Sequence, residues 1–107
     1  MRRTPNPAPV FAALGDERRL RLLERLASGG PLSITRLTSG TRVTRQAITK
    51  HLHVLASAGL VRCSRHGREQ LWELTGEPLR EARQQLDLIA HHWDRALQRL
   101  KVHLGEE

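Results

Sequence analysis

The part of the chain that most limits its fold is residues 44–60, TRQAITKHLHVLASAGL, where a helical pattern ends at a glycine. At about 100° per residue, Ile48, Leu52 and Leu55 fall on one side of a helix. The opposite side is polar, basic and free of acids. Gly59 suits the left-handed residue that ends a helix, and it precedes a strand-like run. One side therefore belongs to a core, and the other is a polar surface.

Side chains that can cap a helix precede three of the predicted helices. Asp16, Ser33 and Thr44 each carry an oxygen that can accept a backbone N–H left unpaired in a first helical turn. The last two of these helices are separated by a short turn that contains Gly40, which is the helix-turn-helix pattern. Together with a short first helix, the predicted helices cover residues 9–14, 16–28, 33–39 and 44–58.

The apolar residues predict which faces are buried. In the second helix, Leu20, Leu23 and Ala27 share a face, with Leu22 and Leu26 beside it. His51 borders the apolar side of residues 44–58, and we expect it to be a hydrogen-bonded supporting residue. Aromatic residues and strand cysteines are usually core residues, although a thiol switch at the cysteine remains an alternative. Three more residues are therefore expected in the core: Trp72, Trp93 and Cys63.

After Gly59 the apolar period changes from helical to alternating. LVRCSR and REQLWEL are two strand-like runs joined at His66 and Gly67, which predicts a β-hairpin over residues 60–75. A hairpin that directly follows such a helix is a wing, and its tip is basic. The predicted fold class is therefore mainly α with a small β-hairpin, a winged helix-turn-helix.

The last segment, residues 78–104, reads as one long helix. Its apolar residues recur at alternating spacings of three and four, which is typical of a helix that packs along its length against another helix. We expect pairing with a second copy; the alternative is that the helix folds back over its own domain. The last helix then supplies the dimer interface, with Leu79, Leu86, Ile89, Trp93, Leu97 and Leu100.

The basic charge is concentrated in the middle of the chain. The net charge is +7, and residues 25–68 contain eight Lys or Arg and no acid, whereas residues 77–107 contain five bases and six acids. A one-sided basic surface favours double-stranded DNA as partner. The short basic helix suits the major groove, where Arg, Gln and Thr can reach base edges and other bases neutralise phosphates.

We assign the exposed residues to two roles in DNA binding. Arg45, Gln46 and Thr49 are predicted to contact bases, because Arg can pair with guanine and Gln with adenine. Phosphate or wing contacts are predicted for Arg42, Thr44, Lys50, His53, Arg65, His66 and Arg68.

The same sequence argues against several other classes of protein. Cys63 is the only cysteine, which excludes a disulfide framework and a multi-thiolate zinc site within one chain. There is no Gly-rich phosphate loop and no nucleophile with an evident base, so we expect neither an enzyme nor a cofactor. No apolar run approaches the roughly 18 residues of a membrane span. We expect a cytoplasmic protein, with a flexible tail over residues 1–7 and one domain over residues 8–107.

Three blocks of the chain resemble the ArsR-type (ArsR/SmtB) winged-helix transcriptional regulators, over nearly its whole length. LGDERRLRLLERLASGGPLS is similar to the family's entry helix and turn, TRQAITKHLHVLASAGLV to its recognition helix and next strand, and HGREQLWELT to its wing. The resemblance implies a homodimer that binds an inverted-repeat operator and usually represses. It also implies that the first and last helices form the dimer interface, which adds Phe11 to the interface residues. A protein-interaction module remains the alternative, because winged helices also serve as docking surfaces.

The resemblance brings the family's metal sites only in part. The Cys-x-Cys pair of metal-sensing members would fall in ITRLTS, which has no sulfur. The family's second pattern, on the last helix, is met by His92, His103 and Glu106, but Ala90 stands where an aspartate would be. A metal-responsive repressor that uses His92 and His103 is a further alternative, and the inducing signal is unknown.

Overall fold

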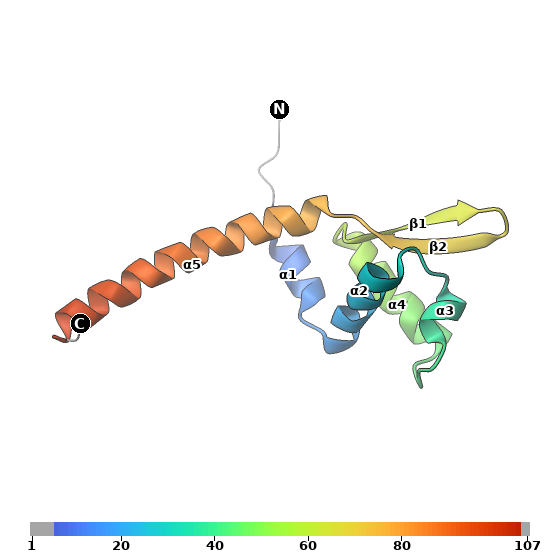
Figure 1. The fold of residues 1–107 in the computed structure, drawn as a ribbon, viewed down its shortest axis with the longest axis horizontal. Helices are drawn as coiled ribbons and strands as arrows, with labels where there is room; N and C mark the ends of the chain where they lie inside the picture. Colours follow the sequence, from blue (N-terminus) through green and yellow to red (C-terminus); the bar gives the residue numbers. More distant parts are fainter. Residues whose placement is uncertain (1–5, 106–107) are drawn as a thin grey trace, which may run out of the picture.

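Within residues 6–105, the part of the chain that this computed structural model describes, there are five helices and one antiparallel hairpin (Figure 1). The predicted fold class, mainly α with a small β-hairpin, is confirmed, and each element begins within one residue of its predicted start. Helices α1–α4 pack together, and α5 leaves them as a long projecting helix. The elements are α1 (Ala8–Leu14), α2 (Glu17–Gly29), α3 (Ile34–Thr38), α4 (Arg45–Ser57), β1 (Val61–His66), β2 (Glu69–Leu74) and α5 (Glu77–His103).

The three predicted caps are all formed. The Asp16 side chain accepts two backbone N–H groups at the start of α2, with N···O distances of 2.8 and 3.2 Å. Ser33 and Thr44 each accept one, at 3.2 and 3.1 Å. The N–H of Arg19 is the main reason that the pKa of the Asp16 carboxyl lies below its ordinary value. Local hydrogen bonds therefore define where α2, α3 and α4 begin.

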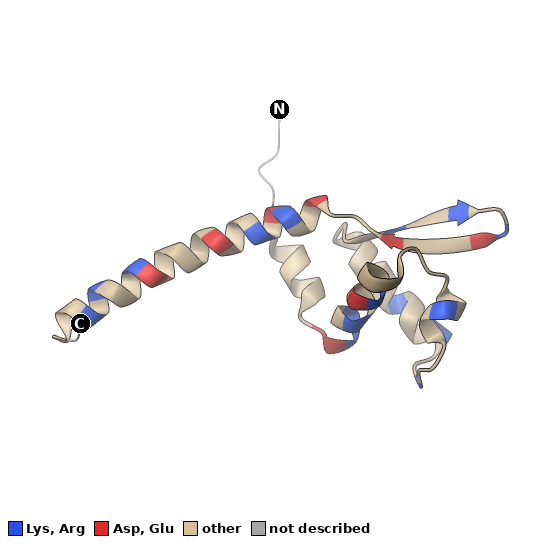
Figure 2. Ribbon diagram, viewed as in Figure 1, with Lys and Arg blue, Asp and Glu red and all other residues tan. Residues whose placement is uncertain are grey.

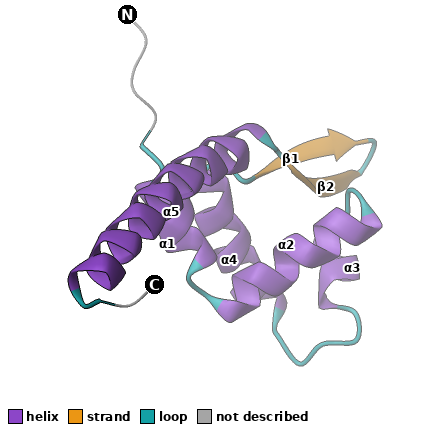
Figure 3. Cartoon of the chain, turned by 60° about the vertical axis from the view of Figure 1, so that its left-hand side comes forward, coloured by secondary structure: helices purple, strands orange, loops and turns teal. Residues whose placement is uncertain are grey.

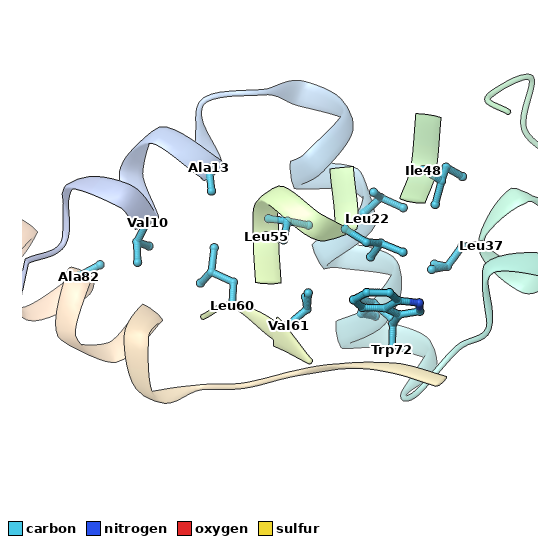
Figure 4. Close-up of a cluster of buried hydrophobic side chains, with 12 residues drawn as sticks. Val10, Ala13, Leu22, Leu37, Ile48, Leu55, Leu60, Val61, Trp72 and Ala82 are labelled. Carbon is cyan, nitrogen blue, oxygen red and sulfur yellow. The ribbon is translucent and has the colours of Figure 1, made fainter. Parts of the chain in front are cut away.

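The core is a continuous cluster of apolar side chains from every helix and from the hairpin (Figure 4). Leu37, Leu52 and Leu55 are fully buried at its centre. The predicted inner face of α2 was wrong: Leu22 and Leu26 are buried there, whereas Leu20 is 45% exposed. Tertiary packing explains the difference. Helix α2 packs against both α4 and β2, and it is rotated so that Leu22 and Leu26 meet them.

Two glycines with positive φ make the connections around the hairpin possible. Gly59, at φ 78°, follows the end of α4 and leads into β1, and Gly67, at φ 65°, lies in the turn between the strands. The strands pair with Cys63 opposite Trp72, and the backbone of Trp72 also exchanges hydrogen bonds of 2.8 and 3.0 Å with Leu32. The base of the hairpin is thus fixed to the segment before α3, while its tip extends freely.

Cys63 is exposed, so its prediction as a small core residue was wrong. Leu32 and the helices α2 and α3 contact β2, and β1 is left with α4 as its helical neighbour. Trp72, on β2, is consequently only 6% exposed, whereas Cys63 on β1 has no such cover. An alternating strand pattern does not show which strand of a hairpin the helices will cover.

Helix α5 packs against the rest of the chain only at its start. Ala82 is 1% exposed and faces Val10 of α1, as Figure 4 shows. From residue 86 to residue 105 every residue is exposed, and α5 projects well beyond the other helices in two views (Figures 1 and 3). The radius of gyration is 18.5 Å, whereas a compact chain of this length has about 13 Å.

The alternative that α5 folds back over its own domain is wrong, because the helix projects away from it. The prediction that Trp93 is a core residue of the single chain is wrong, because it is 64% exposed. The same prediction for Trp72 is confirmed. Periodicity identifies an apolar face, but it does not say whether the same chain supplies the covering surface.

The predicted flexible tail lies mostly outside the described residues, which begin at Asn6. The two described residues of that segment, Asn6 and Pro7, directly precede α1. The Asn6 side chain accepts the backbone N–H of Ala8 at 3.1 Å, and the Pro7 carbonyl accepts that of Phe11. The flexible tail over residues 1–7 therefore stays a prediction.

Candidate nucleic-acid interface

The outer face of α4 is polar and basic, as predicted. Arg45, Gln46, Lys50 and His53 are exposed, and Thr49 is half-buried beside them. The opposite face of α4 is buried in the core. Because α4 contains no Asp or Glu, a polyanion can approach this face without meeting a negative side chain.

Two hydrogen bonds orient the side chains of the first turn of α4. The guanidinium Nη1 of Arg45 donates to Oγ1 of Thr35 in α3, at 2.9 Å. The Thr49 hydroxyl donates to the Arg45 carbonyl at 2.8 Å. Arg45 is thus held toward α3, and Thr49 presents its methyl group and oxygen lone pairs, since its proton is used within the helix.

The wing carries its free positive charge at the tip. Arg65 and Arg68 are exposed on either side of the turn, and the His66 ring lies 3.1 Å from the Ser64 hydroxyl. Nearer the base, Arg62 is paired with Glu73 at 2.9 Å and is largely neutralised. Figure 2 shows α3 and α4 with Lys and Arg but no acid, whereas α2, α5 and the hairpin carry both signs of charge.

The tip of the wing and the start of α4 meet across a basic cleft. This cleft has a volume of about 490 Å³ and lies between α3, the first turn of α4 and the hairpin. Its one acidic lining residue is Glu69, so positive charge dominates. The arginines that line it are Arg36, Arg45, Arg65 and Arg68.

Arg36 is the cleft residue that we did not assign to the site from the sequence. It lies in the acid-free stretch, but nothing in its local pattern predicts that α3 faces the wing. Arg25, in the same stretch, has a different role. Its guanidinium donates to the carbonyls of Arg36, at 2.7 Å, and Leu37, so it joins α2 to the end of α3.

The other predicted contact residues are spread around this face. Arg42 is exposed in the turn before α4, and the Thr44 hydroxyl is used as the α4 cap. His53 packs near Trp72, with ring centroids 6.1 Å apart and planes inclined by 49°. His51 is half-buried, and its predicted supporting hydrogen bond is not among those formed by residues 6–105.

The predicted dimer residues on α5 form an exposed apolar stripe. Their exposed fractions lie between 45% and 64%, which is high for large apolar side chains. Phe11 differs, because it is half-buried against the core of its own chain. The exposed stripe residues are Leu79, Leu86, Ile89, Trp93, Leu97 and Leu100.

The histidines considered as metal ligands also lie on α5. His92 and His103 are exposed, and Glu106 lies outside the described residues. Among residues 6–105 there is no group of three or more His, Cys, Asp or Glu placed to hold a metal ion. In the same range, none of the helices combines the length and the apolar character of a membrane span.

The arrangement of α3, turn, α4 and basic hairpin defines a class: the winged helix-turn-helix proteins. A family described as a helix-turn-helix domain matches residues 14–64. The HTH-type transcriptional regulator Rv2034 of Mycobacterium tuberculosis is 38% identical over 93 residues, covering 86% of this chain and 82% of that protein. The uncharacterized HTH-type transcriptional regulator YuzN of Bacillus subtilis is also 38% identical, over 81 residues covering 70% of this chain and 88% of YuzN.

Solved structures agree with these relatives. An ArsR-like transcriptional regulator from Rhodococcus sp. RHA1 is 38% identical, covers 94% of this chain and 93% of its own, and superposes with a TM-score of 0.78. The homodimeric winged helix-turn-helix DNA-binding domain Mb0332 of Mycobacterium bovis is 28% identical, with a TM-score of 0.63 and coverage of 78% and 77%. The chain belongs to the ArsR family of winged helix-turn-helix transcriptional regulators.

Proposed function

We propose that two copies of this chain bind an inverted-repeat operator and repress transcription by occupying it. The observation that carries the proposal is the basic cleft, in which the first turn of α4 and the tip of the wing face a shared space lined by four arginines. In this arrangement α4 enters the major groove while the wing follows the adjacent backbone. A regulator of this kind acts where the DNA is, in the cytoplasm.

Sequence is read by the outer side of the first two turns of α4. Gln46 is exposed and free of side-chain hydrogen bonds within residues 6–105, so its amide is available to an adenine edge. Arg45 reaches guanine by giving up its hydrogen bond to Thr35 and donating to the base instead. Thr49 offers its methyl group to thymine. These three contacts supply discrimination and little of the total affinity.

Affinity comes from phosphates on both sides of the groove. Lys50 lies next to the reading side chains, Arg42 lies exposed in the turn before α4, and Arg36, Arg65 and Arg68 surround the cleft. Each neutralised phosphate releases counterions, so the logarithm of the binding constant falls with the logarithm of salt by about 0.9 per contact. His53 and His66 stand at the edge of this surface and can add phosphate contacts.

Pairing through α5 gives the protein a two-fold symmetry that matches an inverted-repeat operator. The exposed apolar stripe is too long to leave in water, and the relative Mb0332 is a homodimer. A two-fold dimer carries two α4 helices related by the same axis, and such a pair reads two inverted half-sites. The dimer is a proposal for this chain, as are the residues assigned to its interface.

The test is binding to the DNA upstream of the protein's own gene, measured by fluorescence anisotropy over a range of salt concentrations. Gln46→Ala is expected to lose about 1–3 kcal/mol of discrimination at one base pair in each half-site. Arg68→Ala should weaken binding to all sequences equally and lower the salt slope by about 0.9 for each lost contact. Arg95→Gln, on the outer side of α5, is the control and should change neither.

The outcome that would contradict the proposal is affinity independent of both salt and sequence. Repression is tested separately, with a reporter gene placed behind the bound DNA. Deletion of the regulator should raise the reporter's expression, and Gln46→Ala should restore less repression than the wild-type chain.

A further inference from the structure

A second basic concavity lies on the other side of the helix-turn-helix. It has a volume of about 410 Å³ and lies between the start of α2, the turn after α3 and the middle of α4. His51, which lines it, is roughly 165° around α4 from the centre of the three side chains proposed to read bases. The concavity is therefore distinct from the cleft beside the wing. The basic residues that line it are Arg18, Arg21, Arg25, Arg42 and His51.

All charged side chains that line this concavity are basic, and its lining contains no Asp or Glu. Two acids stand nearby, and both are engaged: Glu17 pairs with Arg21 at 2.5 Å, and Asp16 caps α2. Arg18 and Arg42 make no ion pair with any of residues 6–105. Two free guanidinium groups thus point to an anion that would bridge α2 and the turn.

The floor of the concavity is apolar. Leu22, Leu37 and Ile48 are buried beneath the charged rim, and Val43 closes one side. Guanidinium groups over an apolar floor suit an anion that carries a non-polar body, since the charged end is paired and the body excludes water. The volume is large enough to hold a small molecule.

The site is connected to the helix that reads DNA. Arg25 lines the concavity and also donates to the last carbonyls of α3. Arg42 and Val43 lie in the turn that joins α3 to α4. An occupant would therefore touch the residues that set the position of α4 relative to the core.

We propose that this concavity binds a phosphate or carboxylate group through Arg18 and Arg42. The group has two chemical sources, a small organic anion with an apolar body or the sugar-phosphate backbone of DNA next to the operator. The DNA source rests on the function proposed above, whereas the binding of a free anion does not. Two experiments, one without DNA, separate these cases.

The first experiment is a titration of the full chain with phenyl phosphate, followed by two-dimensional amide NMR in the absence of DNA. A small organic anion is expected to produce saturable shifts at Arg18, Val43 and His51. Arg18→Gln and Arg42→Gln should each weaken binding by at least about tenfold, since each removes a charge-assisted pair. The matched control, Arg95→Gln, should bind as the wild type does. Amide spectra of the free variants establish that each is folded.

The second experiment measures operator binding by Arg18→Gln as a function of salt. If DNA supplies the anion, the salt slope falls by about 0.9 and phenyl phosphate competes with DNA. If the anion is free, Arg18→Gln keeps the wild-type slope but loses the response to phenyl phosphate. The proposal is overturned if the slope is unchanged and the titration shows either no saturable shifts or the same shifts in both arginine variants. Failure to bind any DNA would contradict the function proposed above and leave the first experiment to decide this site.

Discussion

Leu97 and Leu88 form a matched pair for testing the role of α5. They are the same residue type on the same helix, exposed to 48% and 51%, respectively. Nine residues at about 100° place them on opposite sides of the helix. Leu97 belongs to the apolar stripe that begins beside buried Ala82, and Leu88 does not. The perturbation is Leu97→Ala, with Leu88→Ala as its control.

The size of the effect follows from the exposed half of the side chain. Full burial of a leucine side chain contributes about 1.5–3 kcal/mol. Since Leu97 is about half exposed in the single chain, covering it in a dimer contributes about 1 kcal/mol per chain. A symmetric dimer loses this contribution twice, or about 2 kcal/mol. Leu97→Ala should therefore raise the dimer dissociation constant by about 30-fold.

The assay is sedimentation equilibrium of each variant over a wide range of protein concentration. Leu88→Ala is expected to leave the dissociation constant within about twofold of the wild-type value, because exposed single substitutions have small effects. Equal weakening by the two variants would refute the assignment of the stripe. A wild-type chain that stays monomeric throughout would refute the pairing itself.

Three further predictions concern the single chain. The lowered pKa of Asp16 means that its ionised form stabilises the fold above the unfolded pKa, near 3.8, and that this contribution is lost as the pH falls through the lower folded value. Asp16→Ala should therefore unfold at a lower temperature than the wild type at pH 7, and the two unfolding temperatures should converge near pH 2. Asp16→Asn should lower the unfolding temperature less at pH 7. Gly59→Ala should lower the free energy of unfolding by about 1–2 kcal/mol or more in urea titrations, because φ is 78° and the new Cβ would lie 3.0 Å from Pro78, and an unchanged midpoint would contradict this. Cys63→Ser should change that free energy by less than about 0.5 kcal/mol, and the native thiol should react readily with an aromatic disulfide reagent, since Cys63 is exposed.

The elements of this fold are predictable from sequence because their ends are determined by local chemistry. Asp16, Ser33 and Thr44 cap helices within hydrogen-bonding distance of their own first turns, and Gly59 and Gly67 adopt backbone angles that other residues avoid. The outer face of α4 is predictable for a similar reason, since helical periodicity separates it from the buried leucines.

What the sequence does not show are relations between distant elements. The buried face of α2 depends on where α4 and β2 lie, and the exposure of Cys63 depends on which strand the helices cover. Arg36 joins Arg65 and Arg68 across about thirty residues of chain, which only the packing of α3 beside the hairpin explains. Trp93 has the pattern of a core residue, but the surface that would cover it is not part of the same chain.

Binding to two designed duplexes tests the central claim most directly. One duplex carries the two half-sites, once footprinted, at their natural spacing, and the other carries five extra base pairs between them, which turns one half-site by about half a helical turn. Two chains joined through α5 should bind the first duplex as a pair and the second far more weakly, with salt-dependent affinity. Equal affinity for both duplexes, with chains that bind each half-site independently, would contradict the account.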